Sequence, residues 1–374
     1  MQKVSEQLGH VLLVGFEGDG WSRELDELLR DIRPAGVIFF ERNIAVVEQF
    51  QHLVTQVRGA LETPALGPPV LAPILAIDQE GGMVDRLRKV LAPLPSARNA
   101  AAAGLGFELG QMAGRELAAF ALNVDFAPVL DLSTPQSVNI LASRTAGETP
   151  QQVIAFAEQF LAGLAEQGIV GCGKHFPGLG SAEKDTHLAM PCIDKSESEM
   201  WETDLAPFRA LAPRLPMIMV AHAAYPLLEG KWSANGTTLP ASLSFILISA
   251  LLQHRIGFSG LVLSDDLEMG ALEGRSIEQA AIDALWAGCD LLLVCRKAQN
   301  VRRVWEALRQ QAERDSGFRA LVEQAAAKVS RARQALPTSS PADKPFSNWG
   351  VLRQKIQELT AVVRARCAIS EPRQ

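Results

Sequence analysis

Short runs of apolar and often β-branched residues recur along the chain and alternate with longer amphipathic stretches. Runs of this kind are typical of strands buried on both faces, as in a parallel sheet. The pattern therefore predicts eight buried strands, at residues 10–16, 36–40, 73–78, 123–131, 169–176, 217–225, 261–267 and 290–295.

The stretches between these runs have the spacing and end signals of helices. In the clearest case Thr149 can cap the helix, Pro150 suits its first position, and Gly168 can end it. Apolar residues between Val153 and Leu164 return to one face of this stretch. A similar arrangement precedes the last strand, so helices are expected to alternate with strands.

Eight strands that alternate with helices predict an α/β fold of the (β/α)₈ barrel type. A doubly wound open sheet is the alternative architecture. The first strand is not followed by a GxGxxG sequence, which disfavours a dinucleotide-binding form of that alternative.

The end of the chain differs from the rest in composition. Residues 338–350 are rich in Pro and Ser, and residues 351–367 have the pattern of one further amphipathic helix. We therefore expect a barrel domain over residues 1–335, followed over residues 336–374 by a linker and an extra C-terminal helical segment.

Composition narrows the class of protein. Apolar residues form 48% of the 374 residues, and the net charge of −6 with mixed signs argues against a nucleic-acid or membrane-surface partner. Five cysteines without a CxxC pair fit a reducing compartment. The first twenty residues lack the pattern of a signal peptide, and no run approaches the length of a membrane span. We therefore expect a cytoplasmic protein.

Polar side chains collect where five of the eight strands end, the position at which barrels carry their active sites. These residues are Asp78, Glu80, Asp131, Lys174, His175, His222, Asp265 and Asp266. The residue types alone leave three kinds of chemistry open. Lys174 could form a Schiff base, or His175, His187, His222 and Asp265 could bind a metal. The third possibility is glycoside hydrolysis by a carboxylate nucleophile and a proton donor.

The sequence KHFPGLGSAEKDTHLAMP, from Lys174 to Pro191, resembles the signature of glycoside hydrolase family 3. The match is to its β-N-acetylglucosaminidase branch, whose signature is KHFPGHG, four residues, DSH, three residues and P. Further similar blocks follow in the same order, from about residue 8 to residue 297. They are GVIFFERNI, AIDQEGGMVDRL, NVDFAPVLDL, SRTAGETP, MIMVAHAAYP, PASLS and SDDLEMGAL.

The resemblance implies a retaining β-N-acetylhexosaminidase on a (β/α)₈ barrel. The first aspartate of SDDLEM, Asp265, matches the nucleophile of the family. His187 matches an unusual histidine acid/base, and Asp185 matches the aspartate that pairs with it. Because these two residues are separated by one position, both side chains can project the same way from an extended loop.

The same matches imply contacts to the hydroxyl groups of the sugar by Asp78, Arg86, Arg144, Lys174, His175 and His222. The chain departs from the family pattern at three positions near the implied catalytic residues. Leu179 replaces a histidine, Met83 replaces an arginine, and Thr186 replaces a serine.

The function implied is removal of terminal β-linked N-acetylglucosamine from peptidoglycan fragments such as GlcNAc–anhydro-MurNAc, with or without peptide. The implied partner is thus a small carbohydrate, with no metal, cofactor, nucleic acid or membrane, and the chain is expected to be a monomer or weak dimer. Alternatives are a β-N-acetylglucosaminide phosphorylase, a β-glucosidase of the same family, and a sugar-binding barrel without catalysis.

Overall fold

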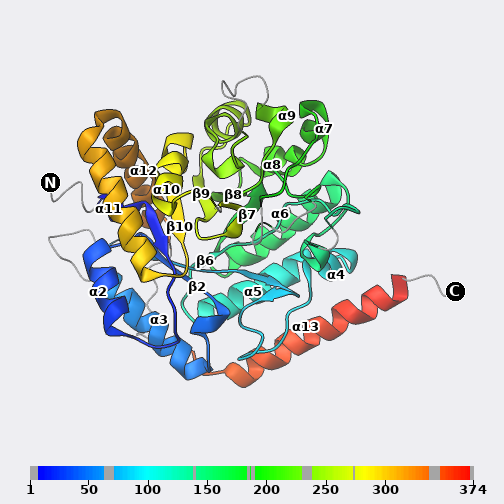
Figure 1. Cartoon of the computed structure of the whole chain (residues 1–374). Coiled ribbons are helices and arrows are strands. Elements are labelled where there is room, and N and C mark those ends of the chain that lie inside the picture. The colour runs from blue at the N-terminus through cyan, green and yellow to red at the C-terminus, as the bar shows by residue number, and fades with distance from the viewer. Residues whose placement is uncertain are drawn as a thin grey trace.

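The computed structural model describes residues 7–62, 71–137, 140–182, 186, 190–229, 238–272, 274–336 and 346–370. A closed barrel of parallel strands lies at its centre, with helices around it (Figure 1). The strands are β1 (Leu12–Val14), β2 (Gly36–Phe39), β3 (Ile74–Ile77), β6 (Val124–Asp125), β7 (Val170–Phe176), β8 (Met217–Val220), β9 (Leu261–Asp266) and β10 (Leu291–Val294). The predicted (β/α)₈ barrel is confirmed, and the open sheet is wrong because β1 pairs with both β2 and β10.

Alternation along each strand divides the apolar residues between two layers. In β1, Leu13 packs inside the barrel, whereas Leu12 and Val14 face the surrounding helices. Both layers exclude water, since all three side chains are fully buried. This explains why the strands are apolar at nearly every position.

The helices that cover the barrel follow the strands along the chain. They are α2 (Arg23–Ile32), α3 (Val47–Glu62), α4 (Ala97–Ala102), α5 (Gly106–Ala119), α6 (Pro150–Glu166), α7 (Glu197–Glu202), α8 (Leu205–Leu211), α9 (Pro226–Glu229), the π-helix η4 (Ile246–Arg255), α10 (Ile277–Ala287), α11 (Ala298–Arg314) and α12 (Ser316–Gln334). The predicted start of α6 is confirmed. The Thr149 side chain accepts a hydrogen bond from the backbone N–H of Gln152, and Pro150 is the first residue of the helix.

One strand is much shorter than its apolar run. The run at residues 123–131 forms only the two-residue β6, which ends before Pro128. Proline has no N–H to donate to a ladder. The chain nevertheless stays beside β7, because Val129 forms an isolated parallel bridge with Lys174.

A small hairpin that the sequence pattern does not predict follows β3 and consists of β4 (Gln79–Gly81) and β5 (Val84–Asp85). Gly81 and Gly82 have positive φ angles of 83° and 61°, which a side chain would strain. A Cβ atom on Gly81 would also lie 2.3 Å from the carbonyl oxygen of Pro95. The two glycines therefore allow a tight turn at the barrel mouth.

The C-terminal helix α13 (Trp349–Ser370) lies against α4 and α5 (Figure 1). Leu352, Ile356 and Val363 are buried in this contact. The Arg353 guanidinium also donates to the carbonyl oxygen of Val90 at 2.9 Å. The extra helix is therefore docked on the outside of the barrel.

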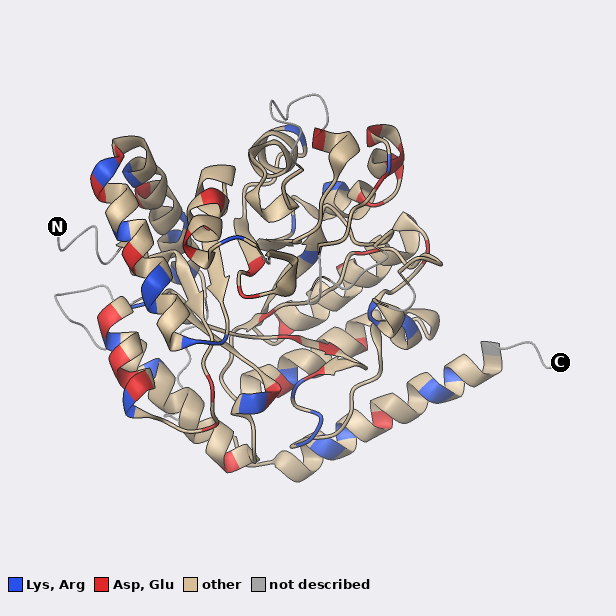
Figure 2. Ribbon diagram, in the orientation of Figure 1, with Lys and Arg blue, Asp and Glu red and all other residues tan. Residues whose placement is uncertain are grey.

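Charged residues of both signs are mixed on the outer helices (Figure 2). Arg302 on α11 pairs with Asp31 of α2 at 2.9 Å, and Arg303 pairs with Glu278 of α10 at 2.7 Å. These pairs join neighbouring helices at the surface. In the part of the chain that the structure describes, no helix combines the length and apolarity that crossing a membrane requires.

Candidate active site

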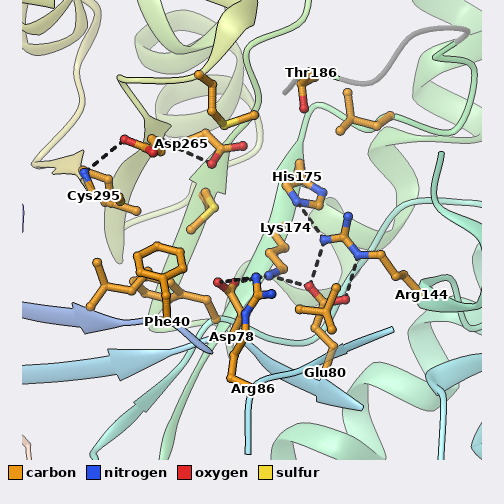
Figure 3. Close-up of a pocket in the computed structure, with 18 of the residues that line it drawn as sticks. Phe40, Asp78, Glu80, Arg86, Arg144, Lys174, His175, Thr186, Asp265 and Cys295 are labelled. Carbon is orange, nitrogen blue, oxygen red and sulfur yellow. Dashed lines mark hydrogen bonds and ion pairs between the residues drawn. The ribbon is translucent and has the colours of Figure 1, made fainter. Parts of the chain in front are cut away.

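A cavity of about 290 Å³ opens at the carboxyl ends of the barrel strands (Figure 3). Its floor is apolar and includes Phe126, Met219 and Leu293, which belong to the inner layer of the barrel. Charged side chains form its walls. The cavity thus combines an apolar base with convergent polar groups, as small-molecule sites generally do.

Lys174 is the centre of an ion-pair network on one wall. It lies in β7, and its Nζ is 2.6 Å from Oδ1 of Asp78 and 2.6 Å from Oε1 of Glu80. Asp78 directly follows β3 and Glu80 lies in β4, so the network joins three elements. Lys174 and Glu80 are almost fully buried, and their charges are balanced by neighbours rather than by water.

Arg144, at the end of the 3₁₀ helix η2 (Ala142–Arg144), extends this network. Its Nε and Nη2 donate to the two carboxylate oxygens of Glu80, each at 2.8 Å. Nη2 also lies 3.4 Å from Nε2 of His175. On the other side of that ring, Nδ1 is 2.7 Å from Oδ2 of Asp131. The ring of His175 is therefore fixed on both sides.

The network sets the charges of its members. Burial would raise the pKa values of Asp78 and Glu80, but nearby cations hold both below their ordinary range. These cations are Lys174 and Arg86 for Asp78, and Arg144 and Lys174 for Glu80. Burial would lower the pKa of Lys174, but the two carboxylates raise it. Nearby opposite charge thus outweighs desolvation. Lys174 is a charged ammonium group in this site.

The opposite wall of the cavity contains Asp265 (Figure 3). Asp266 follows it as the last residue of β9 and also lines the cavity. Oδ1 of Asp265 accepts the backbone N–H of Asp266 at 2.8 Å. Oδ1 of Asp266 instead accepts the N–H groups of Glu268 and Cys295, both at 3.1 Å. Burial raises the pKa of Asp266 to about 6, with smaller contributions from Glu268 and Asp265.

An aromatic ring and two guanidinium groups form the mouth of the cavity. The Arg42 and Arg86 guanidinium carbons lie 4.3 and 5.9 Å from the centre of the Phe40 ring. Arg42 donates to the carbonyl oxygens of Phe16 and Cys295, which links the segment after β2 to the segments after β1 and β10. Arg86 reaches Asp78 with 3.6 Å between Nη2 and Oδ2.

Comparison with known proteins identifies the family of this site. Residues 3–332 match the family described as Glycosyl hydrolase family 3 N terminal domain. The chain belongs to glycosyl hydrolase family 3. It is a glycoside hydrolase, so the alternative of a sugar-binding barrel without catalysis is wrong.

Individual relatives agree with this assignment. Proteins named beta-hexosaminidase from Tolumonas auensis and Idiomarina loihiensis are 36% and 33% identical to the chain. Each alignment covers 79% of this chain, and it covers 86% and 87% of the two relatives respectively. The solved structure of a family 3 β-N-acetylglucosaminidase from Paenibacillus superposes with a TM-score of 0.81 at 28% identity, covering 95% of this chain and 68% of that one.

The cavity brings together most of the residues that the family motifs select. Those that line it are Asp78, Arg86, Arg144, Lys174, His175 and Asp265. They come from segments spread over nearly 190 positions of the sequence, and the ends of the barrel strands gather them. Their roles in binding or catalysis remain predictions.

Asp185 and His187, the expected acid/base pair of this hydrolase, lie outside the described residues. Thr186, between them, is described and lines the cavity. Its carbonyl oxygen accepts the N–H of Ala271 at 3.1 Å, which links it to the 3₁₀ helix η5 (Gly270–Leu272) shortly after Asp265. Leu179, one of the departures from the family pattern, is buried in the cavity wall, whereas Met83 is 61% exposed.

His222 does not line the cavity, in contrast to the expected sugar contact. It is fully buried, with Nδ1 2.6 Å from Oγ of Ser242 and Nε2 3.0 Å from the carbonyl oxygen of Asp266. Both ring nitrogens thus have partners within the protein. The ring supports the end of β9 from behind.

The residue types left two other kinds of chemistry open, and the geometry disfavours the first of them. A Schiff-base lysine needs a lowered pKa, and the pKa of Lys174 is raised by two carboxylates. The suggested metal site combined His175, His222, Asp265 and His187. Among the described residues, no three His, Cys, Asp or Glu side chains form a group that could hold a metal ion.

Phe40 and Arg42 line the cavity but were not among the sequence-based candidates. They lie in the block GVIFFERNI, directly after β2, so their position at a strand end was the available signal. Gln79 was also missed, because it lies behind the cavity wall.

Proposed function

We propose that this hydrolase is a retaining exo-β-N-acetylglucosaminidase with Asp265 as its nucleophile. The observation that carries the proposal is the position of the Asp265 carboxylate, across the cavity from a preformed wall of paired charges (Figure 3). A sugar held on that wall would present its anomeric carbon to Asp265. The names of the relatives, beta-hexosaminidase and β-N-acetylglucosaminidase, favour this sugar over glucose.

In the proposed first step, the Asp265 carboxylate forms a bond to the anomeric carbon and the bond to the leaving oxygen breaks. His187 gives a proton to that oxygen, and Asp185 orients the ring and stabilises its positive charge. In the second step, His187 takes a proton from water, and the water oxygen displaces Asp265. The two inversions retain the configuration of the sugar.

The charged wall would recognise the sugar hydroxyl groups. Five of the polar side chains that line the cavity could contact a bound sugar: Asp78, Lys174, His175, Arg144 and Arg86. Their mutual contacts fix them before substrate arrives, which reduces the entropy lost on binding. Hydrogen bonds between charged groups and hydroxyls are also strong and directional.

The proposed natural substrates are peptidoglycan fragments such as GlcNAc–anhydro-MurNAc, with or without peptide, in the cytoplasm. This choice is supported by the resemblance of residues 174–191 to the signature of the β-N-acetylglucosaminidase branch. Comparing release of N-acetylglucosamine from this disaccharide and from chitobiose would test it. Faster hydrolysis of chitobiose would contradict the assignment.

Covalent trapping is the most direct test of the mechanism. A 5-fluoro N-acetylglucosaminyl donor should form a slowly hydrolysed adduct, and peptide mapping should find it on Asp265. The Asp265→Asn variant provides the control and should not be labelled. Label on another residue would overturn the nucleophile assignment, and sugar 1-phosphate formed in phosphate buffer would identify a phosphorylase.

A further inference from the structure

Gln79 occupies the far side of the segment that carries two cavity-facing carboxylates. In extended backbone, alternate side chains point to opposite faces. Asp78 and Glu80 line the cavity, whereas Gln79 between them is fully buried behind it. Its position suggests that it controls where its two neighbours point.

The Gln79 amide has a partner for each of its polar atoms. Nε2 donates to Oδ1 of Asp85 and to Oε2 of Glu116, both at 2.7 Å. Oε1 accepts the backbone N–H of Arg86 at 2.9 Å. The backbone N–H of Gln79 itself donates to Oδ1 of Asp125 at 2.9 Å. One side chain thus joins β4 to β5 and anchors both to α5.

The carboxyl groups around Gln79 are unlike those facing the cavity. Glu116 and Asp125 are fully buried, and Oε1 of Glu116 and Oδ2 of Asp125 have no hydrogen-bond partner among the described residues. An ionised carboxylate left in this state is very costly. Burial accordingly raises the pKa values of both groups, and neighbouring acids raise them further. Burial therefore favours the protonated form of these two carboxyl groups, whereas nearby cations favour the ionised form of Asp78 and Glu80.

We propose that Gln79 is a positioning residue that, through hydrogen bonds to Glu116, Asp85 and the Arg86 backbone, fixes Asp78, Glu80 and Arg86 for sugar binding. The inference rests on the proposed function for its kinetic readout. The hairpin that carries these groups has only two short strands, β4 and β5. Without the Gln79 amide, the hairpin would lose its link to α5 and shift relative to Lys174 and Arg144.

The kinetic test compares Gln79→Met, which keeps length but cannot form these hydrogen bonds, with Leu308→Ala. Leu308 is buried in α11 and does not line the cavity, so its variant controls for a general loss of stability. With p-nitrophenyl N-acetylglucosaminide, Gln79→Met should raise KM about tenfold and lower kcat/KM about 100-fold, the effect of displacing binding groups by about 1 Å. Leu308→Ala should leave KM unchanged, because a smaller folded fraction does not alter KM. Equal KM values for the two variants would overturn the proposal.

A second pair of variants tests the hydrogen bond itself. Glu116→Gln keeps an oxygen that can accept from Gln79, whereas Glu116→Met has none. We expect Glu116→Gln to stay within about threefold of the wild-type KM and Glu116→Met to resemble Gln79→Met. Equal losses for both Glu116 variants would contradict a role of the acceptor, even if Gln79→Met failed to fold.

Amide hydrogen exchange separates this inference from the proposed function, because it needs no substrate. Residues 79–87 should exchange at least tenfold faster in Gln79→Met than in Leu308→Ala at matched distance below Tm. A wild-type protein without glycosidase activity would refute the proposed function, but this exchange difference would still support the positioning role. Unchanged exchange at residues 79–87 would refute the positioning role alone.

Discussion

The two walls of the cavity hold carboxylates in opposite electrostatic environments. On the wall from β3 and β7, Lys174 and Arg144 neutralise Asp78 and Glu80 at 2.6–2.8 Å. On the wall from β9, backbone N–H groups contact Asp265 and Asp266. No cation among the residues in the described ranges forms an ion pair with Asp265.

This difference fits a division of labour between the walls. A carboxylate paired with a buried lysine is fixed and weakly nucleophilic, which suits recognition of hydroxyl groups. A carboxylate held by backbone donors keeps a lone pair available for carbon, which suits covalent catalysis. Substitutions on the two walls are therefore expected to change different properties of the protein, and by different amounts.

The largest effect is expected on the β9 wall. Asp265→Asn keeps the shape of the side chain but removes the proposed nucleophile, so kcat on an aryl N-acetylglucosaminide should fall about 10⁴-fold. Stability should change little, because the backbone hydrogen bond can form with the amide oxygen. Asp266→Asn serves as the neighbouring control. A larger loss of kcat for Asp266→Asn would transfer the nucleophile role to that residue.

On the other wall, Lys174→Met should lower both stability and binding. It leaves Asp78 and Glu80 without their shared cation, and breaking a buried pair in this way costs about 3–5 kcal/mol. Urea denaturation measures this loss. The exposed pair of Arg30 with Asp26 on α2 offers a control, since Arg30→Met should cost less than about 1 kcal/mol. Similar costs for both variants would show that the cavity pair is not specially stabilising.

The pKa shifts predict opposite pH dependences for the two walls. Because the pKa of Glu80 is lowered on folding, its contribution to stability is present above its unfolded value of about 4.5 and is lost as pH falls below it. The pKa of Asp266 is instead raised on folding, to about 6. Its contribution to stability is therefore present below its unfolded pKa of about 3.8 and is lost as pH rises through about 6.

Urea denaturation between pH 3 and pH 7 checks this contrast with Glu80→Gln and Asp266→Asn. The stability advantage of the wild type over Glu80→Gln should shrink toward acid pH. Its advantage over Asp266→Asn should shrink toward neutral pH. Slopes of the same sign for the two variants would mean that the walls do not differ electrostatically.

The smallest effect concerns His222, which lies behind the β9 wall. His222→Phe would leave the carbonyl oxygen of Asp266 and Oγ of Ser242 without these partners, at a cost of about 1–3 kcal/mol in stability. We expect kcat to fall about tenfold, a barrier change of about 1.4 kcal/mol, with KM unchanged. His254→Phe on η4 is an exposed control. A raised KM for His222→Phe would restore the sugar contact expected from sequence.

Much of the barrel could be predicted from the sequence because its periodicities are local. All eight apolar runs contain a barrel strand, and Thr149 and Pro150 begin α6 as expected. Strand lengths were less predictable, as β6 shows. The hairpin β4–β5 was missed because its strands are too short for an alternating pattern and depend on Gly81, Gly82 and contacts with residues 94–96.

For the candidate site, the sequence could predict which residues take part but not how their side chains are arranged. Motif spacing selected Asp78, Arg86, Arg144, Lys174, His175 and Asp265, and all line one cavity. The same reasoning placed His222 with them, because a strand-end histidine looks alike in sequence whether it faces the cavity or packs behind it. Gln79 gave no signal at all, since its role depends on Glu116, which is 37 positions away.

The sequence by itself determined the barrel, the order of its strands along the chain and the residue types available for chemistry. These properties follow from side-chain periodicity and from motifs that are short in sequence. Only the tertiary structure decided which carboxylates are paired with cations, which are buried without a cation beside them, and which face Asp265. Those outcomes depend on burial and on charges brought within a few ångströms by barrel closure, and no local pattern encodes them.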